Sequence, residues 1–432
     1  MFNLLNETTM KTKSVSLLIF FLICAPCFAQ LSIEDCYQKA QANYPLIKQY
    51  NLIEQTKEYN LSNANKGYLP QITVSAKATY QSEVTQFPVD FSQLGIPEMT
   101  IPTLSKDQYG ASIDINQTIW DGGIISSQKE KLRAAAEVEK KNIEVNIYAV
   151  NERVNQLYFG ILFTGEQIRQ IELLQEELQN NHDKIKAFIQ NGIALPSDLD
   201  AVKVEQLKAQ QNKSRLNKTK IIYVTMLSML IGEDLNEYTE FVKPEAIRPE
   251  IEQFKRPELY LFQAQIKNFE ARNQEITAAV MPKLGLFVTG GYGKPGLNML
   301  DNEFAPYYIG GVRLSWNIGS FYTQKNNRKQ VQTGIASIET QRETFLFNLS
   351  IDATQKHNLI DTYFDQLKYD DEIIALRKSI KQSAETKMAN GTISGSDLTR
   401  DINAEQMAIQ DKILHETELL LAIYNLKFAT NN

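Results

Sequence analysis

Long stretches without proline dominate this chain and limit the folds open to it. No proline lies between Pro102 and Pro196, and none follows Pro306. In the first stretch, apolar residues recur mostly every three or four positions among Glu, Gln, Asn, Lys and Arg, which is typical of a packed helix. The apolar series is Ile147, Val150, Val154, Leu157, Ile161, Ile168, Ile171 and Leu178. A helix over residues 123–190 would extend on the order of 100 Å, so the sequence predicts a coiled-coil-like tube.

Four short segments have the opposite period, with apolar and polar residues in alternation. The first runs from Gln71 to Gln81, and the second sets Ile113, Ile115 and Ile119 between polar neighbours. The third and fourth carry the apolar series Leu284, Leu286, Val288 and Tyr292, and Val312, Leu314, Trp316 and Ile318. A period of two indicates strands with one apolar and one polar face. Each segment is about ten residues long, which suits a tilted strand across a bilayer.

The two kinds of segment follow the same order twice. The predicted elements are a helix at 32–66, a strand hairpin at 70–119, a long helix, a turn at 191–196 and a helix to 232, then a helix at 256–280, a hairpin at 282–318, a long helix, a turn at 390–395 and a helix to the C-terminus. Asn-Gly followed by Ser-Asp-Leu occurs at 191–199 and again at 390–398. We therefore predict two structural repeats, 30–240 and 241–432, after a signal peptide at 1–29.

The signal peptide is predicted from the first 29 residues. Lys11 and Lys13 precede an apolar run that is too short to span a bilayer, and Ala29 offers a small residue for cleavage. Its removal leaves Cys36 as the single cysteine, which cannot close an intrachain disulfide. Cys36 lies in an amphipathic stretch, where we expect it to be a small buried hydrophobe.

Four strands are too few to close a membrane barrel, because the smallest such barrels have about eight. Strand edges left open in lipid would leave backbone amides unpaired, at several kcal/mol each. We therefore expect several copies of the chain to share one barrel, with polar strand faces, including Lys77 and Arg313, lining a water-filled lumen. The strand count alone leaves open whether two or three chains take part.

Short motifs along the chain resemble the TolC-like family of outer-membrane efflux proteins. The matching segments are 31–36 (LSIEDC) with 43–45 (NYP), 67–72 (GYLPQI), 120–123 (WDGG), 256–259 (RPEL) and the two Asn-Gly turns. The resemblance implies an α+β membrane protein: a homotrimer with long helices forming a periplasmic α-barrel, and four strands per protomer in a shared twelve-stranded barrel in the Gram-negative outer membrane. A periplasmic adaptor protein and an inner-membrane pump would deliver small molecules to this channel.

The resemblance assigns adaptor docking to the two hairpin tips. The residues are Asn191, Gly192, Ile193, Ala194, Ser197 and Asp198 in the first tip, and Asn390, Gly391, Thr392, Ile393 and Ser394 in the second. Turn chemistry alone explains part of this pattern, since glycine accepts a left-handed backbone and Ser or Asp caps the following helix.

The resemblance also implies a periplasmic gate at Asp397, where three copies of a carboxylate would favour cations in a narrow pore. One turn later, where the family often has a second acid, this chain has Arg400 with Asp401 beside it, so an Asp–Arg network is the alternative. Helix capping is a competing role for Asp397. Ile393 and Met388 occupy positions where some family members have polar latch residues.

Two tryptophans, Trp120 and Trp316, fall near strand-to-helix boundaries, where their amphipathic rings suit a membrane interface; buried packing is the alternative. The three histidines are scattered along predicted helices without nucleophile or metal-ligand spacing, so we expect no enzyme, metal site or cofactor. The chain has 45 Lys+Arg against 51 Asp+Glu and no basic block, which argues against nucleic acid as a partner.

Two other functions stay open from the sequence. The first is a duct for type I protein secretion, which would have the same architecture. The second is a periplasmic coiled-coil scaffold or adaptor without a pore. The hairpins disfavour the scaffold, because a soluble adaptor has no need of bilayer-length strands with a full apolar face.

Overall fold

The computed structural model describes residues 30–85, 103–236, 239–250 and 253–431, so the predicted signal peptide lies outside the described residues. The chain divides into two compact units, each built from both halves of the sequence. The first unit contains the residues up to Ile47, Asn146–Arg256 and the residues from Phe347 on. The second contains Lys48–Val145 and Pro257–Leu346.

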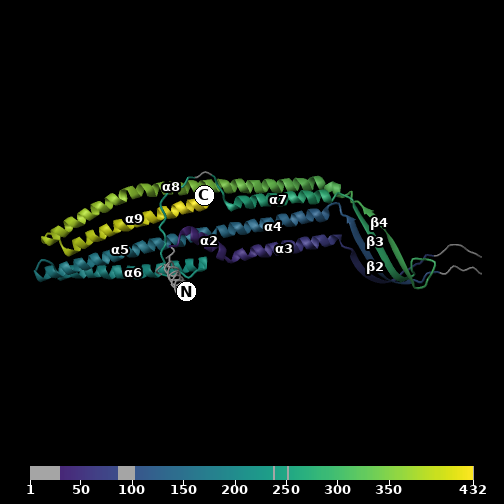
Figure 1. Ribbon diagram of the computed structural model, residues 1–432, viewed down its shortest axis with the longest axis horizontal. Helices are drawn as coiled ribbons and strands as arrows, with labels where there is room; N and C mark the ends of the chain where they lie inside the picture. Colours follow the sequence, from purple (N-terminus) through teal and green to yellow (C-terminus); the bar gives the residue numbers. More distant parts are fainter. Residues whose placement is uncertain (1–29, 86–102, 237–238, 251–252, 432) are drawn as a thin grey trace, which may run out of the picture. The chain divides into compact units, whose positions relative to one another are not determined.

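The second unit contains a single antiparallel sheet with the strand order β1-β2-β3-β4 (Figure 1). Its strands are β1 (Gln71–Tyr80), β2 (Asp107–Trp120), β3 (Lys283–Lys294) and β4 (Ala305–Ser315). The helical part of this unit comprises α3 (Gln49–Asn65), η2 (Lys66–Tyr68), most of α4 (Ile124–Tyr148), α7 (Pro257–Ala278) and the first part of α8 (Ser320–Ala389).

The register of the sheet confirms the predicted alternation. Val74 pairs with Ile113 on the apolar face, whereas Thr73 pairs with Asp114, and Asp114 with Thr289, on the polar face. The apolar face is uncovered in the single chain. Ile72, Val74, Tyr308, Val312 and Leu314 are between 66% and 82% exposed. A contiguous apolar surface of this kind marks contact with a membrane or another protein.

The fourth strand lies earlier in the chain than the alternation of residues 312–318 indicates. It begins at Ala305 and ends at Ser315, so Trp316 and Ile318 follow the strand. The backbone turns directly afterwards: Ser320 N–H donates to the Asn317 carbonyl at 3.2 Å and Phe321 N–H to Ile318 at 3.1 Å. These turns begin α8 and end the strand.

The first unit is helical. It contains α2 (Ile33–Asn43), α5 (Val150–Gln190), α6 (Pro196–Ile231), the end of α8 and α9 (Gly395–Thr430), with η1 (Pro45–Lys48) at its border. Helix α5 packs along both α6 and α9. Two predicted helices are interrupted. The one expected at 32–66 breaks at Pro45, which has no N–H to donate, and the one expected at 123–190 divides at Ala149 into α4 and α5.

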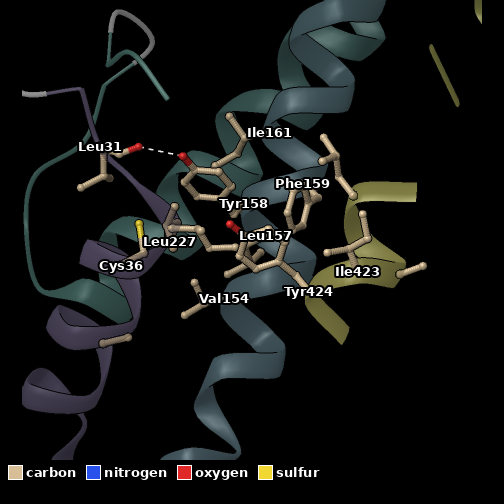
Figure 2. Close-up of a cluster of buried hydrophobic side chains, with 14 of the residues drawn as sticks. Leu31, Cys36, Val154, Leu157, Tyr158, Phe159, Ile161, Leu227, Ile423 and Tyr424 are labelled. Carbon is tan, nitrogen blue, oxygen red and sulfur yellow. Dashed lines mark hydrogen bonds between the residues drawn. The ribbon is translucent and has the colours of Figure 1, made fainter. Parts of the chain in front are cut away.

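Tyr158 lies at the centre of the core of the first unit, with its side chain fully buried (Figure 2). Its hydroxyl donates to the carbonyl oxygens of Leu31 at 2.8 Å and Val242 at 2.7 Å. The ring contacts Phe159 edge-on at a centroid distance of 5.8 Å. Cys36 is fully buried in the same cluster, as expected, and burial raises the pKa of its thiol to about 12.

A second core cluster joins all four long helices toward their turns. It consists of Ile171, Leu178 and Ile185 of α5, Val202, Ala209 and Leu216 of α6, Ala384 and Met388 of α8, and Leu398 and Ile402 of α9. Of the apolar series expected on the first long helix, Ile171 and Leu178 belong to this cluster, whereas Val150, Val154, Leu157 and Ile161 belong to the cluster around Tyr158.

Candidate functional site

The two hairpin turns have the same backbone structure. After α5, Gly192 adopts φ +73°, and Ile193 N–H donates to the Phe188 carbonyl at 2.9 Å. After α8, Gly391 adopts φ +70°, and Thr392 N–H donates to the Lys387 carbonyl at 2.9 Å. Both are glycine C-caps, in which a left-handed residue lets the last carbonyls of the helix find donors. This geometry explains why Asn-Gly stands at both turns.

The helices that follow are capped by aspartates in equivalent positions. Asp198 accepts from Leu195 N–H at 3.0 Å, and Asp397 accepts from the N–H and the hydroxyl of Ser394 at 3.2 and 2.7 Å. Hydrogen bonds from the Ser394 hydroxyl and backbone lower the pKa of Asp397. Both carboxylates thus have a structural role at a helix N-terminus.

The two turns lie against each other. A side chain at Gly395 would approach Asp198 Cβ to 2.8 Å and Ile185 Cδ1 to 3.0 Å, and one at Gly391 would lie 3.6 Å from Ile193. Ile193 nevertheless remains 49% exposed and Leu195 66%. The turns therefore form one tip, on which the exposed apolar side chains are Ile193 and Leu195. Of the predicted docking residues, Ala194 and Ile393 are half-buried, Asp198 is buried, and the exposed ones are Asn191, Gly192, Ile193, Ser197, Asn390, Gly391, Thr392 and Ser394.

A groove of about 520 Å³ runs beside this tip between α6 and α9. Its walls include Val204 of α6 and Arg400 and Met407 of α9. Arg400 lies 3.5 Å from the Asp397 carboxylate, and both side chains are well exposed, so this ion pair contributes little to stability. Asp401 is half-buried on the same helix. The predicted gate residues therefore lie together, with Asp397 paired to Arg400.

Sequence reasoning missed a buried ion cluster that ties α5, α8 and α9 together. Lys381 of α8 lies 2.6 Å from Glu177 of α5 and 2.5 Å from Glu405 of α9, which is 5% exposed. Burial lowers the pKa of Lys381, but the hydrogen bonds that its ammonium donates to the two glutamates, with their charge attraction, outweigh this effect and raise the pKa. The sequence indicates this ion cluster only weakly, through one acid, Glu405, on the apolar side of a predicted helix.

The two tryptophans lie at the helix-facing ends of their strands. Trp120 is the last residue of β2 and is 46% exposed. Trp316 follows β4, where its indole N–H donates to the Val280 carbonyl at 2.9 Å and its ring meets Phe321 edge-on. Both indoles thus have exposed apolar surface, and Trp316 also has a fixed polar contact.

Two further observations bear on function. Within the described ranges, no three His, Cys, Asp or Glu side chains are grouped so that they could hold a metal ion. None of the described helices has the length and apolar character needed to cross a membrane.

The fold of this chain is similar to those of solved outer-membrane channels. The structure is similar to the open state of the MtrE outer membrane channel of Neisseria gonorrhoeae, with 11% identity, 93% of this chain and 89% of that chain covered, and a TM-score of 0.64. The CmeC outer membrane channel of Campylobacter jejuni is 13% identical, with 93% and 86% covered and a TM-score of 0.63. The outer membrane protein VceC of Vibrio cholerae is 9% identical, with 92% and 94% covered and a TM-score of 0.63.

The sequence model of the family described as outer membrane efflux protein matches residues 36–233. No protein with a curated description matches the chain by sequence. Residues 36–233 are therefore similar to the outer membrane efflux proteins, and the chain has the fold of the solved outer-membrane channels. The family resemblance and the fold class predicted from the sequence, long helices with four antiparallel strands, are confirmed.

Proposed function

We propose that this protein is one protomer of the outer-membrane channel of a tripartite efflux system, which passes small molecules to the cell exterior. The main support for this proposal is the β-sheet. Its apolar face is exposed along all four strands, and within the described residues the outer edges of β1 and β4 have no strand partner. Each unpaired amide or carbonyl would cost several kcal/mol in lipid, so the sheet is incomplete as a single copy.

A homotrimer would complete the sheet. When β4 of one copy pairs with β1 of the next, three copies form a closed barrel of twelve strands, an even number within the range of outer-membrane barrels. The apolar faces then meet lipid and the polar faces line a water-filled lumen. Trp120 and Trp316 would lie at the end of the barrel where the helices begin, a position that suits a membrane interface.

The tip would receive a periplasmic adaptor, which connects the channel to an inner-membrane pump. Exposed Ile193 and Leu195 and the adjacent groove supply an apolar surface for such a partner. Asp397, Arg400 and Asp401 would form the periplasmic gate, as a network in which the Asp397–Arg400 pair carries no net charge. The two repeats, 30–240 and 241–432, would each supply one strand hairpin and one helical hairpin.

Deletion of the gene tests the function. We expect hypersensitivity to some compounds in a panel of toxic molecules, reversed by the wild-type protein. A strain with unchanged sensitivity, whose membranes yield no adaptor in pull-downs, would argue against efflux.

The tip is tested by Ile193→Glu with Leu195→Glu. These changes should abolish rescue and adaptor capture while trimers still form. The matched control is Leu173→Glu on α5, which is 50% exposed but far from the turn, and which should retain both activities. Equal loss in the control would contradict a docking role for the tip.

A further inference from the structure

The polar face of the sheet is positively charged, although the chain as a whole has a net charge of -6. The register assigns Lys77, Lys283 and Arg313 to this face, with Asp114 as its one carboxylate within the strands. The other charged strand residues, Asp107 and Lys294, lie at strand ends on the apolar face. Three cations and one carboxylate leave the polar face with a charge of +2 per chain.

The carboxylate is positioned so that it does not neutralise the cations. Asp114 accepts hydrogen bonds from the Thr289 hydroxyl at 2.5 Å and the Ser112 hydroxyl at 3.4 Å. In the register, Lys77 and Arg313 each stand four residues along the strands from the level of Asp114, about 14 Å at ~3.4 Å per residue. This exceeds the Debye length of about 8 Å at physiological ionic strength, so solvent screens most of the attraction.

Two of the cations line one cavity. A pocket of about 290 Å³ on the polar face is bounded by Lys283, Arg313, Asn116, Ser315 and Phe287. The Arg313 guanidinium stacks on the Phe287 ring with its carbon 4.6 Å from the ring centre, which holds the charge over the pocket. Among the described residues, neither Lys283 nor Arg313 has an acidic side chain within ion-pair distance. Their donors are available to a solute.

One acid, Asp121, also borders this pocket, but its carboxylate serves the first turn of α4. It accepts from the backbone N–H of Gly123 at 2.9 Å and of Ile125 at 2.5 Å, and the residue is 6% exposed. Even with Asp121 included, the polar face and its pocket remain positive.

We propose that the barrel selects small anionic solutes, such as carboxylates, phosphates and sulfonates, and that Lys283 and Arg313 form the selecting site. This inference rests on the proposed function, because it requires the polar face to line the lumen. In a trimer the pocket recurs three times around the lumen, which makes a ring of six cations. Rings of one charge sign raise the local concentration of the opposite ion and set the selectivity of a pore.

Reversal potentials of the purified channel in planar bilayers under a KCl gradient test the proposal. The wild type should pass chloride in preference to potassium. The double variant Lys283→Gln/Arg313→Gln should lower the anion-to-cation permeability ratio several-fold while pores still open. The matched control is Lys294→Gln, which removes a cation from the opposite face of β3 and should leave the ratio unchanged.

A conducting but cation-selective wild type would overturn the inference and leave the proposed function standing. An equal effect of Lys294→Gln would also overturn it, since selectivity would then follow net charge rather than the lumen face. A protein that forms no pore would contradict the proposed function itself.

Discussion

Ser394 and Asp397 cap the same helix reciprocally: the backbone N–H of Asp397 donates to the Ser394 hydroxyl at 3.2 Å, and the Asp397 carboxylate accepts from the Ser394 backbone N–H at the same distance. The sequence suggested a gate at Asp397 with capping as the competing role. In the structure Asp397 caps helix α9, and its role in a gate stays a prediction. The two roles are compatible, because a charge that fixes the first turn of α9 also fixes the tip.

The stability that this cap contributes should depend on pH. Ser394→Ala should destabilise the hairpin by about 1 kcal/mol, as capping serines do elsewhere. The pKa of Asp397 is lowered in the folded state, so its contribution is present above the unfolded value of 3.8 and is lost as pH falls through the lower folded pKa. Asp397→Asn should therefore lower the melting temperature at neutral pH but not well below pH 3.8. Thermal melts followed by circular dichroism measure this; a difference that persists in acid would contradict it.

Among the charged residues described in the helices, substitution of Lys381 should lower the stability of the fold most. Lys381→Met leaves Glu405 buried without its cation, and removal of one partner of a buried ion pair typically costs about 3–5 kcal/mol. Adding Glu405→Met should restore most of the loss, because the uncompensated charge is gone. Since the pKa of Lys381 is raised above its ordinary 10.5, the cluster should also weaken only above about that pH. If the double variant is no more stable than Lys381→Met, the cluster does not act as described.

The contact between the two turns predicts a clear difference between two glycines. At Gly395, an added Cβ would lie 2.8 Å from Asp198 Cβ, so Gly395→Ala should destabilise by about 1–3 kcal/mol. At Gly165, in the middle of α5, no described residue beyond the local helix backbone lies within 4 Å of the same atom, so Gly165→Ala should be neutral or stabilise by up to about 1 kcal/mol. Melting of the two variants side by side would decide this, and equal effects would contradict the tip geometry.

Tyr158 joins two distant chain segments to the core through its hydroxyl. Tyr158→Phe removes the hydroxyl that donates to the Leu31 and Val242 carbonyls in a buried site, at about 1–3 kcal/mol, although Leu31 keeps its bond from the Val242 N–H. Tyr424→Phe, which loses one bond of 3.1 Å to the Glu34 carboxylate, should cost less. Chemical unfolding of both variants measures the difference. A larger loss for Tyr424→Phe would contradict the importance given to the Tyr158 hydroxyl.

Local periodicity was enough to predict most of the architecture. The order of helices and hairpins, both turns and the two-faced strands follow from spacings within a few residues of each other. The start of β4 was missed because residues 305–311 include Pro306, Gly310 and Gly311, which are poor strand signals. The break at Ala149 lacks any proline or glycine to mark it.

The cluster around Lys381 shows what sequence patterns do not reveal. Lys381 and Glu177 are 204 positions apart, and only the packing of α5 against α9 and α8 brings them together. The two Ser-Asp-Leu motifs likewise have the same sequence, yet Asp198 is buried and Asp397 is half-exposed. That difference arises from neighbours in space, namely Gly395 against Asp198.

Disulfide cross-linking between β1 and β4 tests the shared barrel most directly. Cysteine at Ser75 is combined in turn with cysteine at Tyr307, Ile309 or Gly311 of β4, which sample different registers on the polar face. The native Cys36 is buried and its thiol pKa is raised to about 12, so it should not interfere. After oxidation in outer-membrane fractions, at least one pair should give covalent dimers and trimers and nothing larger. Monomers alone for every pair, or a ladder beyond three, would contradict a barrel closed by three copies of this chain.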